Sequence, residues 1–197
     1  MSLLLVPVSG RHARDLRSLV AEELITYVPL PALDPGDGIL AFIERAQRLR
    51  ARGAGDTFAV CEDDRLLGIA ALAREERAPD RAELGYWIGR AYRGRGYATA
   101  AARQLLVHGF ERMRLGLVFA RCLSSNRASL RVMEKLGLCF VALEPSDDSR
   151  EPMCRYELDR EQWNDRWPFL TGPERRRSIA AVHRPRPKRL RRGGQPS

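Results

Sequence analysis

The residues with the clearest chemical purpose lie at positions 92–106, in the stretch YRGRGYATAAARQLL. Gly94 and Gly96 let the backbone turn sharply and approach a ligand, and the alanine-rich residues that follow favour a helix. The first turn of a helix presents unpaired N–H groups at the positive end of the helix dipole. Arg93 and Arg95 add full positive charges, so the stretch predicts a polyphosphate site.

Two other phosphate-binding loops fit this stretch less well. A Walker P-loop requires GxxxxGK[ST], but lysine occurs in this chain only at 135 and 188. The dinucleotide pattern GxGxxG fails because its last position is Thr99, and no acidic ribose ligand follows the next strand. Taken alone, the stretch could also be a surface turn with solvated arginines.

A second ordered motif follows about thirty residues later: Asn126-Arg127-Ala128-Ser129 leads into EKLG at 134–137. The segment Arg93-Gly94-Arg95-Gly96-Tyr97-Ala98 fits the pattern [RQ]xxGx[GA], and the strand-like ELGYWIG precedes it. With these motifs in this order, the chain resembles the GNAT superfamily of acetyl-CoA-dependent N-acetyltransferases over about residues 3–165. Within the family it is most similar to the RimJ and RimL branch of ribosomal-protein N-terminal acetyltransferases.

The resemblance implies acetyl-CoA as the cofactor and no metal. It implies that the loop and first helical turn hold the diphosphate of coenzyme A, and that the main chain of Trp87 and Ile88 pairs with the pantetheine arm as another strand would. Asn126 would hydrogen-bond the pantetheine, since its side-chain amide both donates and accepts, and Ser129 would lie near the thioester sulfur. The cofactor residues expected in the loop are Arg93, Gly94, Arg95, Gly96, Tyr97, Ala98 and Thr99.

The implied reaction is direct transfer of an acetyl group to a primary amine, either a protein N-terminus or a small molecule. Glu83 is the candidate base. Strand alternation puts it on the side of Trp87, however, and a carboxylate paired with a nearby arginine is the alternative. Many family members have a tyrosine seven residues after the motif asparagine, where this chain has Met133. Ser129 is therefore the remaining candidate acid, although a serine at a helix start can also be a cap.

Other polar and aromatic residues have simpler interpretations. His108, within the predicted helix, is expected to be a packed or surface histidine, and Cys122 a core residue in its strand. Tyr86, Trp87 and Tyr92 are expected to serve packing first and the acceptor pocket second.

The elements that must position these residues predict a mixed α/β fold. Strands are expected at 3–8, in a hairpin around Asp63-Asp64, and in ELGYWIG, LGLVFARCL, LCFVALE and MCRYELD. Helices are expected at about 11–24, opened by Ser9, and at 38–51, 97–113 and 126–137. The resemblance implies a central twisted mixed sheet of six or seven strands whose parallel fourth and fifth strands splay apart.

The net charge of +9 belongs almost entirely to the last residues. Residues 171–197 contain nine basic residues and one acidic residue, so residues 1–170 are nearly neutral. We expect a GNAT domain over 1–170 and a disordered tail over 171–197 that contacts RNA or ribosomes weakly. Two alternatives stay open: an RNA- or ribosome-associated binding module that uses this tail, and a non-catalytic acetyl-CoA sensor.

The remaining composition predicts a protein of the cytoplasm. The four cysteines form no CxxC pattern, and the short apolar run near the N-terminus lacks the length of a signal or membrane segment. We expect a monomer or a homodimer.

Overall fold

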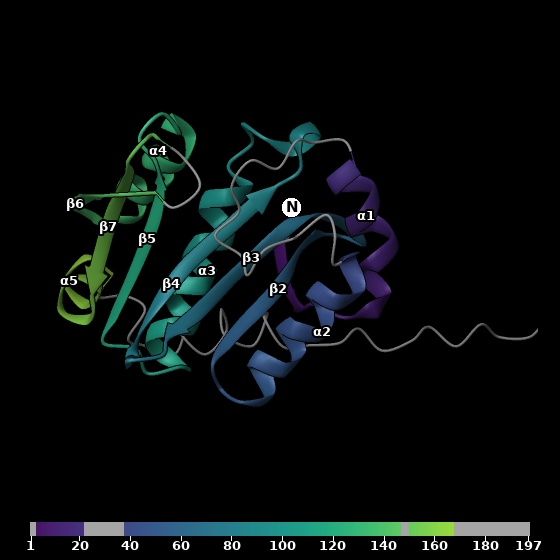
Figure 1. The fold of residues 1–197 in the computed structure, drawn as a ribbon, viewed down its shortest axis with the longest axis horizontal. Coiled ribbons are helices and arrows are strands. Elements are labelled where there is room, and N and C mark those ends of the chain that lie inside the picture. The colour runs from purple at the N-terminus through teal and green to yellow at the C-terminus, as the bar shows by residue number, and fades with distance from the viewer. Residues whose placement is uncertain (1–2, 22–37, 147–149, 168–197) are drawn as a thin grey trace, which may run out of the picture.

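The computed structural model describes residues 3–21, 38–146 and 150–167. They form one seven-stranded mixed sheet in the order β1-β2-β3-β4-β5-β7-β6 (Figure 1). All neighbouring strands are antiparallel except β4 and β5, which are parallel. This confirms the predicted mixed α/β class. The strands are β1 (Leu3–Pro7), β2 (Gly55–Glu62), β3 (Arg65–Glu75), β4 (Ala78–Ile88), β5 (Leu117–Leu123), β6 (Cys139–Glu144) and β7 (Met153–Asp159).

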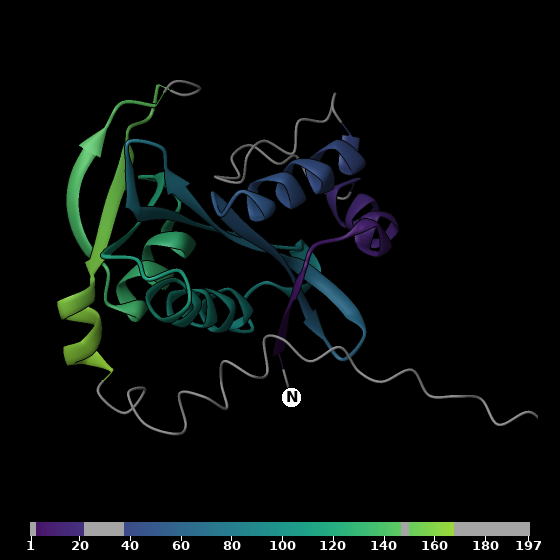
Figure 2. The same ribbon diagram turned by 90° about the horizontal axis from the view of Figure 1, so that it is seen from below.

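Helices cover the two faces of the sheet unequally (Figure 2). On one face α1 and α2 pack on β2 and β3, and on the other α3 packs under β1, β3 and β4 and contacts α4. The helices are α1 (Ala13–Ala21), α2 (Gly38–Ala51), α3 (Tyr97–Glu111), α4 (Arg127–Leu136) and α5 (Arg160–Arg166), with single 3-10 turns η1 (Gly10–His12) and η2 (Arg90–Tyr92).

Two apolar clusters follow from this layering, and strand alternation assigns residues to them. Phe58, Leu84 and Ile88 join the helix residues Leu105 and Phe110 in the cluster under α3. The cluster under α1 and α2 contains Ile69 and Trp87 with Leu16 and Phe42. Because β3 is covered on both faces, its segment LLGIAAL is almost continuously apolar.

Element boundaries differ from the predictions in small ways. The first helix starts as the 3-10 turn η1 before α1 begins at Ala13, and its predicted end at 22–24 lies outside the described residues. The helix predicted to reach residue 113 ends at Glu111. The tail at 171–197 lies outside the described residues too.

The parallel pair β4–β5 is short, and this is what positions the site. Its register contains three pairs, Arg81↔Leu117, Ala82↔Val118 and Glu83↔Phe119. Beyond them β4 continues to Ile88 and β5 to Leu123, and the two strands diverge (Figure 1). The predicted splay is therefore present. Beyond these three pairs β4 and β5 are not paired with each other, so buried main-chain groups that face the gap need other partners; the carbonyl of Ile88, for example, accepts from Arg93.

Candidate active site

A cavity of about 900 Å³ lies between the diverging strands and reaches the first turns of α3 and α4. Of the residues predicted to bind the cofactor, Trp87 and Ile88 line it from β4, and Asn126 and Ser129 line it from the start of α4. Arg95 is the exception, since it is not among the described residues that line the cavity. The loop and α3 contribute Arg93, Gly94, Gly96, Tyr97, Ala98 and Thr99.

The glycines of the loop have left-handed backbones, with φ of 77° at Gly94 and 84° at Gly96. A Cβ built on either glycine meets nothing within 4 Å, so the space in front of the loop is open. Gly96 is the N-cap of α3, and the following first turn lines the cavity with its unpaired N–H groups. This is a cradle of suitable chemistry for a diphosphate.

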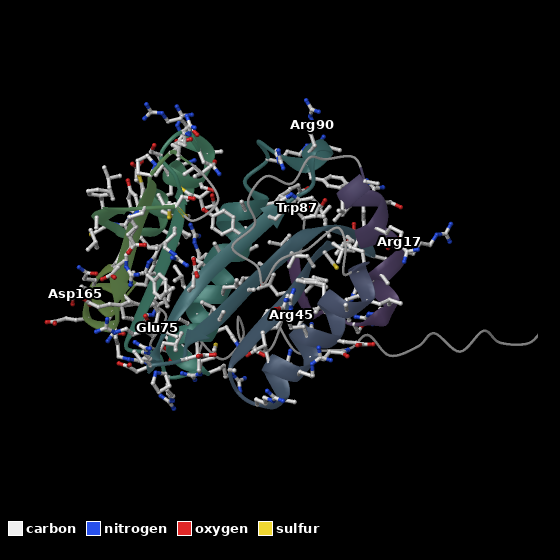
Figure 3. The ribbon with its side chains drawn as sticks, in the orientation of Figure 1. Arg17, Arg45, Glu75, Trp87, Arg90 and Asp165 are labelled. Atoms are coloured by element: carbon white, nitrogen blue, oxygen red, sulfur yellow. The ribbon has the colours of Figure 1, made fainter. Side chains whose placement is uncertain are left out.

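Arg93 ties this loop to the splayed strand. Its Nε donates to the carbonyl oxygen of Ile88 at 2.9 Å. The side chain therefore spans from the loop back to the end of β4 and fixes one relative to the other. Figure 3 shows Trp87 at this end of β4 and Arg90 extending from the turn that follows.

The hydrogen-bonding parity of β4 corrects one prediction. Gly89 N–H donates to the carbonyl of Leu67 on β3, and the register pairs Trp87 with Ile69. Antiparallel pairs alternate, so the main chain of Trp87 points toward β3 and that of Ile88 toward the gap. Strand pairing with an arm in the gap is thus available to Tyr86 and Ile88 and not to Trp87, which lines the cavity with its side chain.

The start of α4 is capped by Asn126 and not by Ser129. Asn126 Oδ1 accepts a hydrogen bond from the backbone N–H of Ser129 at 3.1 Å. The alternative interpretation of Ser129 as the helix cap is therefore wrong. The cap uses the amide oxygen of Asn126, so its NH₂ group is not consumed by capping.

Glu151 holds the loop before this helix. Ser124 Oγ and Ser125 Oγ donate to its carboxylate at 2.8 Å and 2.9 Å, and the backbone N–H of Ser125 donates as well. These hydrogen bonds lower the pKa of Glu151 below its ordinary value. The β5–α4 loop is therefore fixed to the residues that lead into β7.

Tyr86 joins β4 to the same helix start. Its hydroxyl donates to the carbonyl oxygen of Ser129 at 3.3 Å, and burial raises its pKa above the ordinary value. Cys122 lines the cavity beside it, and burial raises the pKa of its thiol to about 12. The thiol stays protonated, which agrees with a packing residue and not with a nucleophile.

Glu83 lies on the other face of the sheet, as alternation predicts, and is held by an arginine. Arg121 Nε and Nη2 each donate to its carboxylate at 3.0 Å. Arg121 itself lines the cavity, whereas Glu83 is not among the described lining residues. Among the described residues, no helix covers β5, β7 and β6 on this face, which we call the open face (Figure 2).

The Glu83–Arg121 pair belongs to an ion-pair ladder across four strands: Glu83, Arg121, Glu144, Arg155 and Glu157. Glu144 approaches Arg121 at 3.7 Å and Arg155 at 3.3 Å. Arg155 stacks 4.0 Å from the ring centre of Phe119. The sequence analysis missed Arg121, although a charged residue within the otherwise apolar LVFARCL was a signal for it.

His108 lies away from the cavity, as its packing interpretation predicts. Its Nε2 is 2.7 Å from Asp56 Oδ2, and its ring packs edge-on against Phe58. Among the described residues, no group of histidine, cysteine, aspartate and glutamate side chains is arranged to hold a metal ion. None of the described helices combines the length and apolar composition needed to cross a bilayer.

Comparison with known proteins identifies the family to which this fold belongs. The family model for the acetyltransferase (GNAT) domain matches residues 2–139. The chain belongs to the GNAT acetyltransferase family. GNAT acetyltransferases use acetyl-CoA, and the open glycine cradle at the end of the cavity fits its diphosphate.

The chain is also similar to individual acetyltransferases in sequence or in fold. The ribosomal-protein-serine acetyltransferase of Escherichia coli is 28% identical over 112 residues, which is 55% of this chain and 63% of that protein. RimL, a ribosomal L7/L12 alpha-N-protein acetyltransferase in complex with coenzyme A, shares the fold with a TM-score of 0.71 at 16% identity, covering 80% of this chain and 94% of RimL. Mycobacterium smegmatis RimJ with CoA-disulfide gives 0.70 at 20% identity, covering 89% and 87%. The matched stretches span between 38% and 63% of the curated relatives' own lengths.

Proposed function

We propose that this chain is an acetyl-CoA-dependent N-acetyltransferase that moves an acetyl group directly to a primary amine. The observation that supports this most is the continuity of the cavity. The same cavity is lined by the glycine cradle before α3, by β4 and β5, and by Arg121, which holds Glu83 on the open face. One cavity can therefore receive a donor from the loop side and an acceptor from the open side.

The donor side follows from the main chain. The N–H groups from Arg93 to Thr99 would bind the diphosphate, and the gap-facing main chain of Tyr86 and Ile88 would pair with the pantetheine arm. Asn126 would offer its amide NH₂ to the same arm. Bound acetyl-CoA would supply an acetyl thioester, and a backbone N–H of the splayed strand near Ile88 would polarise its carbonyl.

The acceptor side centres on Glu83. Its carboxylate lies on the open face next to the cavity-lining Arg121, where it can take the proton of an incoming ammonium directly or through a water molecule. A neutral amine is then available to attack. We propose Glu83 as the base for this reason, with Arg121 holding it in place.

We propose a protein N-terminal amine as the acceptor class, supported by the ribosomal-protein acetyltransferases among the relatives and fold neighbours. A small-molecule amine is the competing outcome. We further propose that residues 1–170 form the GNAT domain in the cytoplasm, and that residues 171–197, which lie outside the described residues, tether it to RNA or ribosomes through their charge.

The test is steady-state release of coenzyme A thiol with acetyl-CoA and a panel of peptides with free N-termini, N-terminally blocked peptides and polyamines. We expect turnover with a subset of the free-N-terminus peptides and none with their blocked versions. Binding of acetyl-CoA without turnover on any amine would support the sensor alternative instead. RNA binding by the full chain and by residues 1–170 tests the tail separately, with salt-dependent binding expected only for the full chain.

A further inference from the structure

The side chain of Tyr86 lines the cavity but has no role in the reaction proposed above. Five hydroxyl-bearing residues are among the described residues that line the cavity. Tyr92, Tyr97 and Thr99 lie at the cradle end, where Tyr97 donates to Glu62 at 2.7 Å. Tyr86 and Ser129 are the two at the β4, β5 and α4 end. The phenol of Tyr86 reaches across the gap, because its ring starts on β4 and its oxygen lies 3.3 Å from the Ser129 carbonyl on α4.

The residues that line the cavity come from both faces of the sheet. Arg121 lines the cavity from the open face, where an acceptor amine would arrive, and Trp87 lines it from the same side of the sheet, within the cluster under α1 and α2. Tyr86, Ala120 and Cys122 line it from the face of α3 and α4. The family resemblance implies that Ser129 lies near the thioester sulfur, and the Tyr86 hydroxyl is 3.3 Å from the Ser129 carbonyl oxygen. Tyr86 is therefore on the side of the leaving group.

Resting on the proposed function, we infer that the Tyr86 hydroxyl donates a hydrogen bond to the departing thiolate of coenzyme A, by turning from the Ser129 carbonyl to the sulfur. In this step the amine nitrogen bonds to the acetyl carbon and the C–S bond breaks with its electron pair going to sulfur. The ammonium proton has gone to Glu83 before this step, and the second proton, which the nitrogen loses as the amide forms, goes to water. Tyr86 keeps its own proton and stabilises the negative sulfur.

The surroundings of Tyr86 favour this role over proton transfer. The groups that face its hydroxyl are the thiol of Cys122 on β5 and the carbonyl of Ser129 on α4, and neither is charged. Burial raises the pKa of Tyr86, so a tyrosinate would be costly, whereas a neutral donor to an anion in a dry site is effective. The position seven residues after Asn126 on the facing helix is the apolar Met133, which also lines the cavity and offers no hydroxyl there.

The experiment compares the wild type with Tyr86→Phe, which removes one oxygen atom. Single-turnover acetyl transfer should slow by about 10- to 100-fold, while KM for acetyl-CoA changes less than about threefold. The diagnostic measurement is the ultraviolet absorbance of the coenzyme A thiolate, titrated with pH in the enzyme complex. The complex with desulfo-coenzyme A, which lacks the thiol, supplies the baseline. The pKa of the bound thiol should be about one unit higher in Tyr86→Phe than in the wild type.

Tyr156→Phe is the matched control. Tyr156 is a buried tyrosine of the same apolar cluster, its hydroxyl is near Glu134, and it is not among the described lining residues. This variant should leave both the turnover rate and the thiol titration unchanged, and unfolding curves of both variants check that the fold is intact.

An unchanged rate in Tyr86→Phe overturns the inference, and so does a slower rate with an unchanged thiol pKa, because a purely structural role would not move that pKa. Adding Met133→Tyr in the Tyr86→Phe background should restore part of the rate from the facing helix. If no amine is acetylated but the thiol pKa still depends on Tyr86, the proposed function fails and the assignment of Tyr86 to the sulfur stands.

Discussion

Gly96→Ala tests the placement of the cofactor, and Gly53→Ala is its matched control. Both glycines have left-handed backbones, with φ of 84° at Gly96 and 66° at Gly53, and a Cβ on either meets nothing within 4 Å. Each substitution therefore adds backbone strain without a clash inside the protein. An L-residue in this conformation costs about 1–2 kcal/mol, so both variants should lose about the same free energy of unfolding.

Only Gly96 lines the cavity, and this separates the two variants in binding. A methyl group there would hold the diphosphate away from the first-turn N–H groups of α3. Losing two hydrogen bonds to a charged group, at about 1.5–3 kcal/mol each, would weaken coenzyme A binding by about 10²- to 10⁴-fold. Gly53 follows the end of α2 and is not among the described lining residues, so the Gly53→Ala variant should bind coenzyme A as the wild type does.

The assays are isothermal titration with coenzyme A and urea unfolding of both variants. The placement is refuted if Gly96→Ala binds coenzyme A normally while losing the same stability as Gly53→Ala. Equal loss of binding in both variants would also refute it, since strain and not the cradle would then explain the effect.

Three further predictions follow from single features. Glu83→Gln should lower kcat/KM by about 10²- to 10⁴-fold and leave coenzyme A affinity unchanged, and full activity would remove Glu83 from the role of base. Gly68→Ala should destabilise the fold by more than Gly53→Ala in urea, because its Cβ would lie 2.0 Å from the Trp87 carbonyl oxygen; equal losses would contradict this close approach of β3 and β4. Burial lowers the pKa of His12 below its ordinary value of 6.5. As pH falls, the His12 imidazole is therefore protonated in the unfolded chain at a higher pH than in the folded protein. Stability should then fall as pH drops from about 6.5 toward the folded pKa, and His12→Gln should remove that part of the pH dependence.

The parts of the site that could be predicted from sequence are local. The glycine cradle depends on residues adjacent in the chain, because a strand, two glycines and a helix start suffice to specify it. Asn126 was likewise found within a contiguous motif. The assignment of its capping role was missed because Asn126 and Ser129 are both suitable cap residues, and only the backbone geometry decides between them.

The parts that could not be predicted depend on pairing between distant segments. The register between β3 and β4 decides whether Trp87 or Ile88 directs its main chain into the gap. Shifting that register by one residue would exchange the two. The pairing of Glu83 with Arg121 requires that β5 lie beside β4 in a particular register. Tyr86 was assigned to packing because its contact with Ser129 joins residues 43 positions apart.

The short contact between β4 and β5 also bears on how the ligand affects stability. Three residue pairs join the two halves of the sheet, so an arm bound in the gap would add the main-chain hydrogen bonds that this stretch lacks. Amide hydrogens at 84–88 and 120–123 should then exchange more slowly with deuterium in the presence of coenzyme A than in its absence. The melting temperature should rise with coenzyme A concentration, because the ligand completes the sheet only in the folded state.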